Sequence, residues 1–419
     1  MKIKDKKIIL LFIVFLVITF TYPGCRGKQG ENIITLRWSF FDDPTGLVIK
    51  KSLAKAYEET HPKVKIVIEN VSGGVYETKI LTEFASRTAP DILIIGSIVA
   101  PFLKKGVLLE LTPYLTRDEV DLSDFYLITL KPFQYHDGIY GLPVYHGPTI
   151  LYYNKRLFDQ AKVSYPDQTW RWEDLLAAAK KLTVDINRDG KVDQWGVLPT
   201  YWQEFIQQNN GSVFNKDGTK CLLGQPEAIE AIQFVADLYN RYKVAPNLYT
   251  RRELGDIQLF VTDKLAMFQA GYWLTDIFRK TKELTWDIAP MPKGKKRSVN
   301  TGVFGYSIST QTKHPEEAWE FLRYLVSKET QIVEAKSANA VPSRKSIANS
   351  PVFLQPHLPP EHNKFVLEAA DYTEVFLYEF EPITVINSEL ESVWMGKKEA
   401  EKVCKELVPR VNKLLEESH

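Results

Sequence analysis

The sequence contains little cysteine, almost no net charge and a single long apolar run. Its 419 residues include three cysteines, and their spacing indicates neither a disulfide framework nor a metal cluster. A formal net charge of +1 argues against nucleic acid as a partner. The usual hydrolase, metalloprotease, phosphate-loop and dinucleotide signatures are missing from the sequence. We therefore expect a protein that is not an enzyme and requires no cofactor.

The apolar run, residues 8–20, follows four lysines and is too short to span a membrane comfortably. This layout predicts a signal peptide over residues 1–24. Tyr22-Pro-Gly-Cys25 resembles a bacterial lipobox, except that a leucine-like residue is usual at Tyr22. The resemblance implies a lipid on Cys25 and a tether over residues 25–32. We expect an exported protein, anchored at the outer face of the cytoplasmic membrane or in the periplasm.

What the chain has in abundance is aromatic residues, 12% of the total, and alternating strand and helix patterns. Strands are predicted at 33–38, 64–69 and 91–95, with helices at 47–60 and 76–86 between them. This alternation predicts an α/β fold with mainly parallel sheets flanked by helices. A chain of this length exceeds one comfortable core, so we expect two domains.

Residues 138–155 contain two extended apolar runs joined by His146-Gly-Pro148. Glycine permits unusual backbone angles and proline lacks an N–H donor, so we expect no continuous strand here. By itself, the stretch fits a crossing between two lobes and a hairpin within one domain equally well.

Nine short motifs occur in an order that spans most of the chain. This order resembles the family 1 extracellular solute-binding proteins of ABC importers, the maltose-binding-protein-like group. The motifs are Pro90-Asp-Ile-Leu, Gly141-Leu-Pro, Leu151-Tyr-Tyr-Asn-Lys155, Trp170-Arg-Trp-Glu-Asp-Leu, Gln194-Trp-Gly, Ala266-Met-Phe-Gln-Ala-Gly-Tyr-Trp273, Ala289-Pro-Met-Pro, Glu317-Ala-Trp-Glu-Phe-Leu322 and Val341-Pro-Ser-Arg-Lys345.

The resemblance implies a two-lobed Venus-flytrap fold in which each lobe uses more than one chain segment. The N-terminal lobe would comprise residues 33–146 and 301–343, and the C-terminal lobe residues 147–300 and 344–419. Three crossings would lie near residues 143–149, 292–304 and 341–346. Such a protein, expected as a monomer, would trap a sugar or oligosaccharide between its lobes and deliver it to membrane permease subunits.

A sugar site needs flat rings for stacking, and carboxylates and amides for the hydroxyl groups. Carried over by position, the expected cleft residues are Trp38, Asp42, Asp43, Gly96, Ser97, Tyr145, Tyr201, Trp202, Gly271, Tyr272, Trp273, Gly302, Phe304 and Arg344. Structural alternatives remain open. Trp38 could belong to the core, Asp42 or Asp43 could cap the next helix, and Arg344 is better explained as a structural donor.

The segment from Asp185 to Asp193 resembles the first nine positions of an EF-hand calcium loop. Its ligands would be Asp185, Asn187, Asp189, the Lys191 carbonyl and Asp193. The glutamate of position 12 is replaced by Gly196. A structural calcium ion and a metal-free turn, stabilised by Asn and Asp side chains, are equally compatible with this pattern.

Two other functions remain open. One is a binding protein for a non-sugar solute, such as a polyol phosphate or a peptide. The other is a secreted glycoside hydrolase, because acidic pairs such as Asp42 and Asp43 could imitate its two carboxylates.

Overall fold

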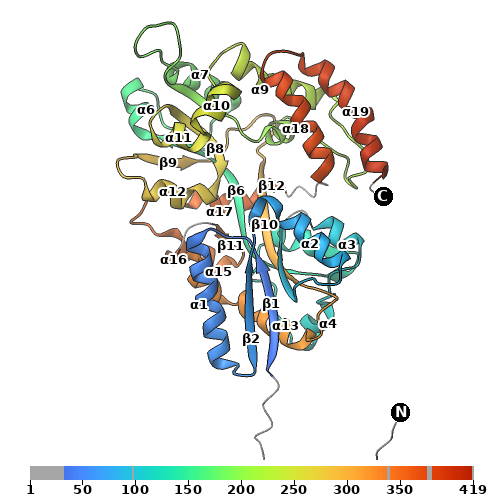
Figure 1. Ribbon diagram of the computed structural model, residues 1–419. Helices are drawn as coiled ribbons and strands as arrows, with labels where there is room; N and C mark the ends of the chain where they lie inside the picture. Colours follow the sequence, from blue (N-terminus) through green and yellow to red (C-terminus); the bar gives the residue numbers. More distant parts are fainter. Residues whose placement is uncertain (1–32, 97–98, 337–339, 375–379, 418–419) are drawn as a thin grey trace, which may run out of the picture.

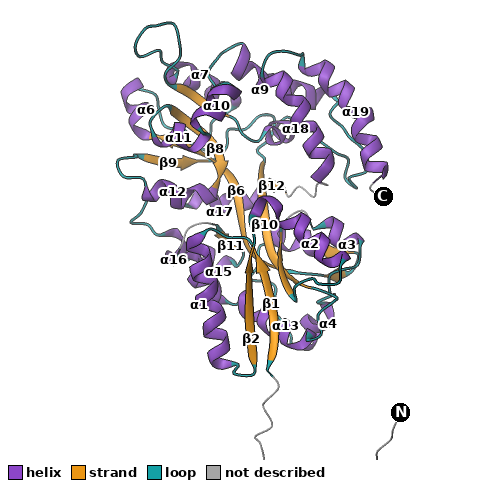
Figure 2. Cartoon of the chain, viewed as in Figure 1, coloured by secondary structure: helices purple, strands orange, loops and turns teal. Residues whose placement is uncertain are grey.

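The computed structural model describes residues 33–96, 99–336, 340–374 and 380–417. The predicted signal peptide, the tether, Cys25 and Ser97 lie outside these residues. The described chain forms two α/β lobes, one above the other in Figure 1, with long strands passing between them. Figure 2 shows strands through the middle of the molecule and helices around them. Among the described residues, no helix is long and apolar enough to cross a bilayer.

The N-terminal lobe begins with the predicted strand–helix alternation. Its first elements are β1 (Ile34–Phe40), α1 (Pro44–Thr60), β2 (Val64–Asn70), α2 (Tyr76–Ala85), β3 (Ile92–Ile95), α3 (Ala100–Lys104), α4 (Thr112–Arg117), α5 (Leu127–Leu130), β4 (Gln134–Tyr135) and β5 (Gly138–Ile139). β1 pairs in parallel with β2 and β3. The strands form because β-branched and aromatic residues fit a pleated sheet that is covered by helices.

Helix α1 illustrates how local sequence builds this lobe. Asp43 caps its N-terminus by accepting a hydrogen bond from Gly46 N at 2.8 Å, and Pro44 occupies the first turn. Leu53, Ala54 and Tyr57 form its buried face. Each large apolar side chain buried in this way contributes about 1.5–3 kcal/mol.

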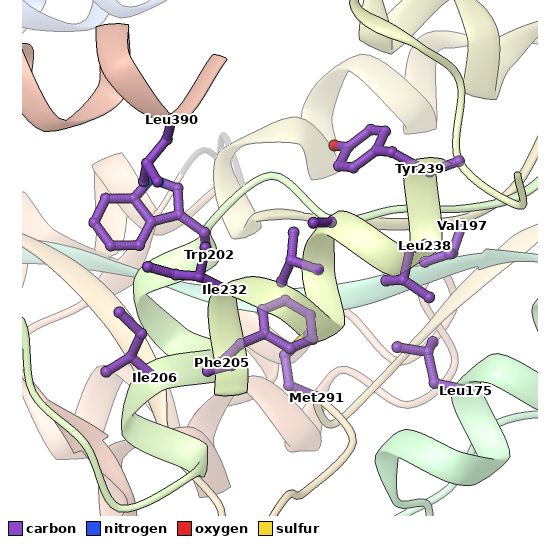
Figure 3. Packing of buried hydrophobic residues seen from close by; sticks show 14 of the residues in the cluster. Leu175, Val197, Trp202, Phe205, Ile206, Ile232, Leu238, Tyr239, Met291 and Leu390 are labelled. Carbon is purple, nitrogen blue, oxygen red and sulfur yellow. The ribbon is translucent and has the colours of Figure 1, made fainter. Parts of the chain in front are cut away.

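The C-terminal lobe carries most of the helices. Its elements up to the return crossing are α6 (Lys155–Ala161), α7 (Trp172–Leu182), β7 (Trp195–Leu198), α8 (Trp202–Gln208), α9 (Pro226–Asn240), α10 (Leu248–Leu254), α11 (Asp256–Val261), β8 (Leu265–Gly271), α12 (Thr275–Lys280) and β9 (Trp286–Ala289). Figure 3 shows part of its core, where Trp202 lies beside Leu390 and Ile232. The two C-terminal helices α18 (Phe380–Trp394) and α19 (Ala400–Glu417) complete this core.

The sheet pairing is more mixed than the sequence suggests. The order is β2-β1-β3-β10-β6-β8-β7, with β10 (Val299–Ile308) antiparallel to β3 and β6 (Leu142–Asn154) antiparallel to β8. Parallel pairing joins β1 to its two neighbours and β7 to β8. The α/β two-lobed fold is confirmed, whereas the parallel pattern holds for these strands only.

The expectation that no continuous strand passes residues 146–148 is wrong. β6 runs without interruption from Leu142 to Asn154, and a hairpin is excluded with it. The strand pairs with β10 up to Pro148 and with β8 from Thr149 onward. Because β6 changes partners at Pro148, the missing N–H of this proline falls between two ladders and costs little.

The other two connections also run beside β6. β10 spans both lobes, since it pairs with β3 and β6 below and with β12 (Thr373–Glu374) above. β11 (Val341–Pro342) pairs with His146 and Tyr145. It follows α13 (Pro315–Leu325) and α14 (Lys328–Ala335), and precedes α15 (Lys345–Ala348), α16 (Pro351–Leu354) and α17 (Lys364–Glu368).

A buried carboxylate joins the three long strands just above the crossing. Glu204 of α8 is 0% exposed and accepts hydrogen bonds from Thr149 Oγ1 of β6, Gln269 Nε2 of β8 at 2.6 Å and Asn300 N of β10 at 2.9 Å. Burial raises the pKa of Glu204 to about 7, although these three donors pull it down.

This carboxylate generates a prediction for stability. The folded state keeps the Glu204 proton up to about pH 7, whereas the unfolded chain loses it near 4.5, so the unfolding free energy falls as pH rises through that window. In Glu204→Gln this contribution is absent. The difference in unfolding free energy between wild type and variant should change by up to about 3 kcal/mol across the window, measured by urea denaturation. A pH-independent difference contradicts this assignment.

Candidate ligand-binding cleft

A cleft of about 700 Å³ lies between the lobes. Most of its described lining comes from the N-terminal lobe and the crossings, and α12 with the turn before it supplies the opposite wall. The lining residues are Phe41, Asp42, Asp43, Gly46, Ile49, Lys50, Val71, Ser72, Gly73, Val144, Tyr145, Gly147, Trp273, Asp276, Ile277, Gly302, Phe304, Gln331, Glu334, Ala335, Ala340 and Pro342.

Aromatic rings form both walls of the cleft. In the N-terminal lobe, the Phe304 ring lies 5.6 Å from Phe41 and 5.4 Å from Tyr145, measured between centroids. Trp273 faces the cleft from the C-terminal lobe and is 42% exposed. Such a large exposed indole beside a concave surface provides a platform for a flat apolar face.

Glycines allow two of these rings to lie close to the backbone. A Cβ at Gly271 would lie 1.9 Å from Cζ3 of Trp273, and one at Gly147 would lie 3.0 Å from Cε3 of the same ring. A Cβ at Gly96 would lie 2.7 Å from the Phe304 ring. Gly96 and Gly271 therefore leave space for the Phe304 and Trp273 rings and do not line the cleft themselves.

An ion pair between distant segments lies against the cleft. Lys50 Nζ of α1 binds Glu334 Oε1 of α14, and the Lys50 side chain is 5% exposed. Burial opposes the charge of Lys50, but Glu334, with smaller contributions from Tyr145 and Asp42, outweighs burial, so the pKa of the ammonium is raised. Tyr145, whose pKa burial raises well above the usual value, lies within electrostatic range of this ammonium.

The two acids before α1 differ in role. Asp43 caps the helix, as the structural alternative proposed. The Asp42 side chain lies over Gly46, since a Cβ added at Gly46 would come 1.8 Å from Oδ1 of Asp42. Asn70 Nδ2 donates to the backbone carbonyl oxygen of Asp42 at 3.1 Å. Burial raises the pKa of the Asp42 carboxyl, while Lys50 lowers it in part.

Six of the expected cleft residues line the cleft: Asp42, Asp43, Tyr145, Trp273, Gly302 and Phe304. Trp38 does not line the cleft, because it is buried in the core of the N-terminal lobe. Its side chain is 0% exposed, and its ring lies 4.7 Å from Phe40 and 5.3 Å from Phe321 in the lobe core. Strand alternation directs Trp38 into the helical layer instead of toward the cleft.

The expected positions of Tyr272 and Trp202 in the cleft are also wrong, because both rings are buried. Tyr272 is 0% exposed and donates its hydroxyl to Asn363 Oδ1 at 2.8 Å. Trp202 is 6% exposed and donates from Nε1 to Asn387 Oδ1 at 3.0 Å. Tyr201 is half-buried and lies outside the described lining.

Arg344 is a structural donor, as the alternative interpretation of this residue expected. It donates from Nε to the Val326 carbonyl at 2.8 Å and lies over the Phe125 ring at 4.2 Å. Ser346 binds Asp124 from the same segment, so residues beyond 343 still contact the N-terminal lobe.

Several lining residues were missed from the sequence. Phe41 lies beside the predicted Asp42, and a loop aromatic at a strand end is a usable signal. Lys50 looks like any helical lysine, and its partner Glu334 lies 284 residues away. Gln331 shares one face of α14 with Glu334 because they are three residues apart, and its Nε2 has no hydrogen-bond partner within the described protein.

Among the described residues, one group of acidic and histidine side chains lies close enough together to hold a metal, namely Asp287, Glu361 and His362. The predicted calcium loop forms no such group; it is exposed, with Gly190 at φ +86° and its N–H donating to Asp185 Oδ2 at 2.9 Å. The group around Asp287 is already paired internally. His362 Nδ1 lies 2.6 Å from Asp287, and Lys155 lies 2.8 Å from Glu361.

Comparison with known proteins identifies the family. The model of the bacterial extracellular solute-binding proteins matches residues 44–332. The chain belongs to this family. An arabinooligosaccharide-binding protein of Bacillus subtilis is 24% identical to this solute-binding protein over 338 residues, 76% of each chain.

Solved structures confirm the fold. The substrate-binding protein Lmo0181 from Listeria monocytogenes, in complex with cycloalternan, is 26% identical, with a TM-score of 0.83 over 92% of this chain and 99% of that one. The maltose/maltodextrin-binding domain MalE from Bdellovibrio bacteriovorus, bound to maltotriose, is 20% identical, with a TM-score of 0.74 over 91% of this chain and 100% of that one.

The support of Trp273 by Gly271 can be tested directly. In Gly271→Ala the new Cβ would displace the indole into solvent, because overpacking at 1.9 Å forces the ring to move. Trp273 is the one exposed tryptophan among the described residues, so acrylamide quenching of fluorescence should increase. Gly74→Ala is the matched control, because its Cβ meets nothing within 4 Å. Equal quenching in both variants contradicts the role of Gly271.

Proposed function

We propose that this protein captures a neutral sugar-like solute, a sugar or oligosaccharide, for an ABC importer. The observation that carries the proposal is the pairing of Trp273 on one lobe with the Tyr145–Phe304 wall on the other. A sugar ring between these walls would stack its apolar face, while carboxylates and amides bind its hydroxyls. The oligosaccharide ligands named for the related proteins support the same class.

The polar lining suits hydroxyl groups. Gln331 Nε2 is a donor, the Asp42 oxygens are acceptors, and Lys50 with Glu334 presents both. These groups lie on the N-terminal lobe, whereas Trp273 lies on the other. A solute that contacts both sides stabilises the closed arrangement over an open one by its differential affinity, with β6 and β10 as the hinge.

A thermal-shift screen of mono- and oligosaccharides tests this function. A bound sugar at 100 times its Kd adds about 2.7 kcal/mol to the unfolding free energy and raises the Tm by a few degrees. Trp273→Ala should weaken the affinity for that sugar about tenfold or more, because a stacking surface is lost. Tyr249→Ala is the control, an exposed aromatic outside the lining. If a polyol phosphate or a peptide raises the Tm and no sugar does, the alternative solute class replaces this proposal.

Further parts of the proposal concern the whole protein. We propose binding without catalysis, because the family captures solutes and Asp43 is engaged as a helix cap. Export by the signal peptide, lipidation at Cys25, a monomeric state and docking to permease subunits complete it. The lipobox-like Tyr22-Pro-Gly-Cys25 supports the anchor.

A structural calcium ion in the loop from Asp185 to Asp193 is a separate proposal. The oxygens of Asp185, Asn187, Asp189 and Asp193 and the Lys191 carbonyl match the first positions of an EF-hand. Gly196, at position 12, packs on Ala179, so water has to complete the shell.

Removal of calcium should therefore destabilise the protein. Excess EDTA is expected to lower the Tm by a few degrees and calcium to restore it, because bound calcium stabilises by mass action. Asp185→Asn should abolish the response to both. Identical melting curves with and without EDTA contradict a bound ion.

A further inference from the structure

The ionisable groups in the cleft have one predominant sign. Among the described lining residues, Asp42, Asp43, Asp276 and Glu334 are acidic, and Lys50 is the one base. The sequence has no lysine or arginine in the internal segments that the structure does not describe, residues 97–98, 337–339 and 375–379. The local balance is therefore negative, although the whole chain is close to neutral.

Lys50, the one basic side chain of the described lining, is already paired with a carboxylate. Lys50 Nζ binds the Glu334 carboxylate, and the side chain is 5% exposed. An anionic solute would have to compete with this internal carboxylate for the ammonium. It would also lie against Glu334 itself, so the attraction of Lys50 would be largely cancelled.

The other usual anion site is closed as well. The N-terminus of α1 faces the cleft, and its free N–H groups would normally favour an anion. Asp43 Oδ1 already accepts from Gly46 N at 2.8 Å, and Asp42 Oδ1 accepts from Asp43 N at 3.0 Å. The chain thus places two carboxylates where a phosphate or carboxylate of a solute would bind.

The remaining acid extends this field to the opposite wall. Asp276 of α12 lines the cleft and pairs with Lys280, whose side chain is 61% exposed and outside the lining. Solvent screens this pair, so Lys280 neutralises Asp276 only in part at the cleft. A solute between the lobes therefore meets carboxylates on both sides.

From this arrangement we infer that the cleft selects its carbohydrate by charge: it accepts neutral and amino sugars and rejects uronic and phosphorylated ones. The inference rests on the proposed sugar-binding function. A buried anion loses its hydration without gaining a free donor cation. An ammonium group on the sugar, by contrast, can replace its water by the Asp42 and Glu334 oxygens in charge-assisted hydrogen bonds.

Isothermal titration of the full-length protein with matched trisaccharides tests this selection. The six probes are the trisaccharides of glucose, glucosamine and glucuronic acid, and of galactose, galactosamine and galacturonic acid, at pH 7. In the series that binds, the amino sugar should bind at least as tightly as the neutral one, and the uronic acid should bind at least about tenfold more weakly. Equal affinity for the neutral and uronic members overturns charge selection while leaving sugar binding intact. If all six fail and no sugar raises the Tm in the thermal-shift screen, sugar binding is overturned, and the inference with it.

Two variants locate the selectivity in the cleft. Glu334→Gln releases Lys50, whereas Asp42→Asn removes a carboxylate and leaves both partners of the Lys50–Glu334 pair in place. Each should raise uronate affinity relative to the neutral sugar by about tenfold. Glu401→Gln makes the same change of charge in an exposed i,i+4 pair with Lys405 on α19 and should leave the ratio unchanged. An equal change in all three variants, or no change in Asp42→Asn, overturns the inference.

Discussion

The pairing of β6 with β10 is the constraint on which the rest of the structure depends. Each strand passes through both lobes, and they are held antiparallel from Thr301 opposite Pro148 to Tyr306 opposite Leu142. The lobes are therefore joined by hydrogen-bonded ladders and not by flexible chain. The register shift after Phe304 and the change of partners at Pro148 are the local weaknesses of this connection. Bending at such points changes the angle between the lobes while each lobe keeps its own core.

The same crossing also shapes the cleft. Gly147 leaves room for the Trp273 ring. Tyr145 of β6 and Phe304 of β10 lie opposite each other on these neighbouring strands and form the other wall. Residues of the crossing are thus also residues that form the walls. Buried polar groups complete this arrangement. Burial lowers the pKa of His146 to about 3, so this side chain stays neutral between the lobes, while Glu204 above it ties three strands together.

The acidic character of the cleft comes from a different part of the fold. Asp42 and Asp43 are there because α1 begins directly after β1, and Glu334 is there because α14 returns to pack beside α1. Strand-to-helix turns usually present N–H groups to a ligand. Here the chain's own carboxylates accept hydrogen bonds from these N–H groups, which is the basis of the proposed preference for hydroxyl and ammonium groups.

The sequence by itself determined the family, the two-lobed α/β fold and most elements close to their observed bounds, such as 64–69 for β2 and 172–182 for α7. It did so because periodicity and capping are local, and because the motifs and their order are read directly along the chain. It also identified Trp273, Asp42 and Phe304 as cleft residues. Only the tertiary structure decided that Trp38, Tyr272 and Trp202 face the cores, because the direction of a side chain in a strand or at the start of a helical turn depends on what covers that face. It also decided the Lys50–Glu334 pair, since two charges 284 residues apart have no relation until the chain folds.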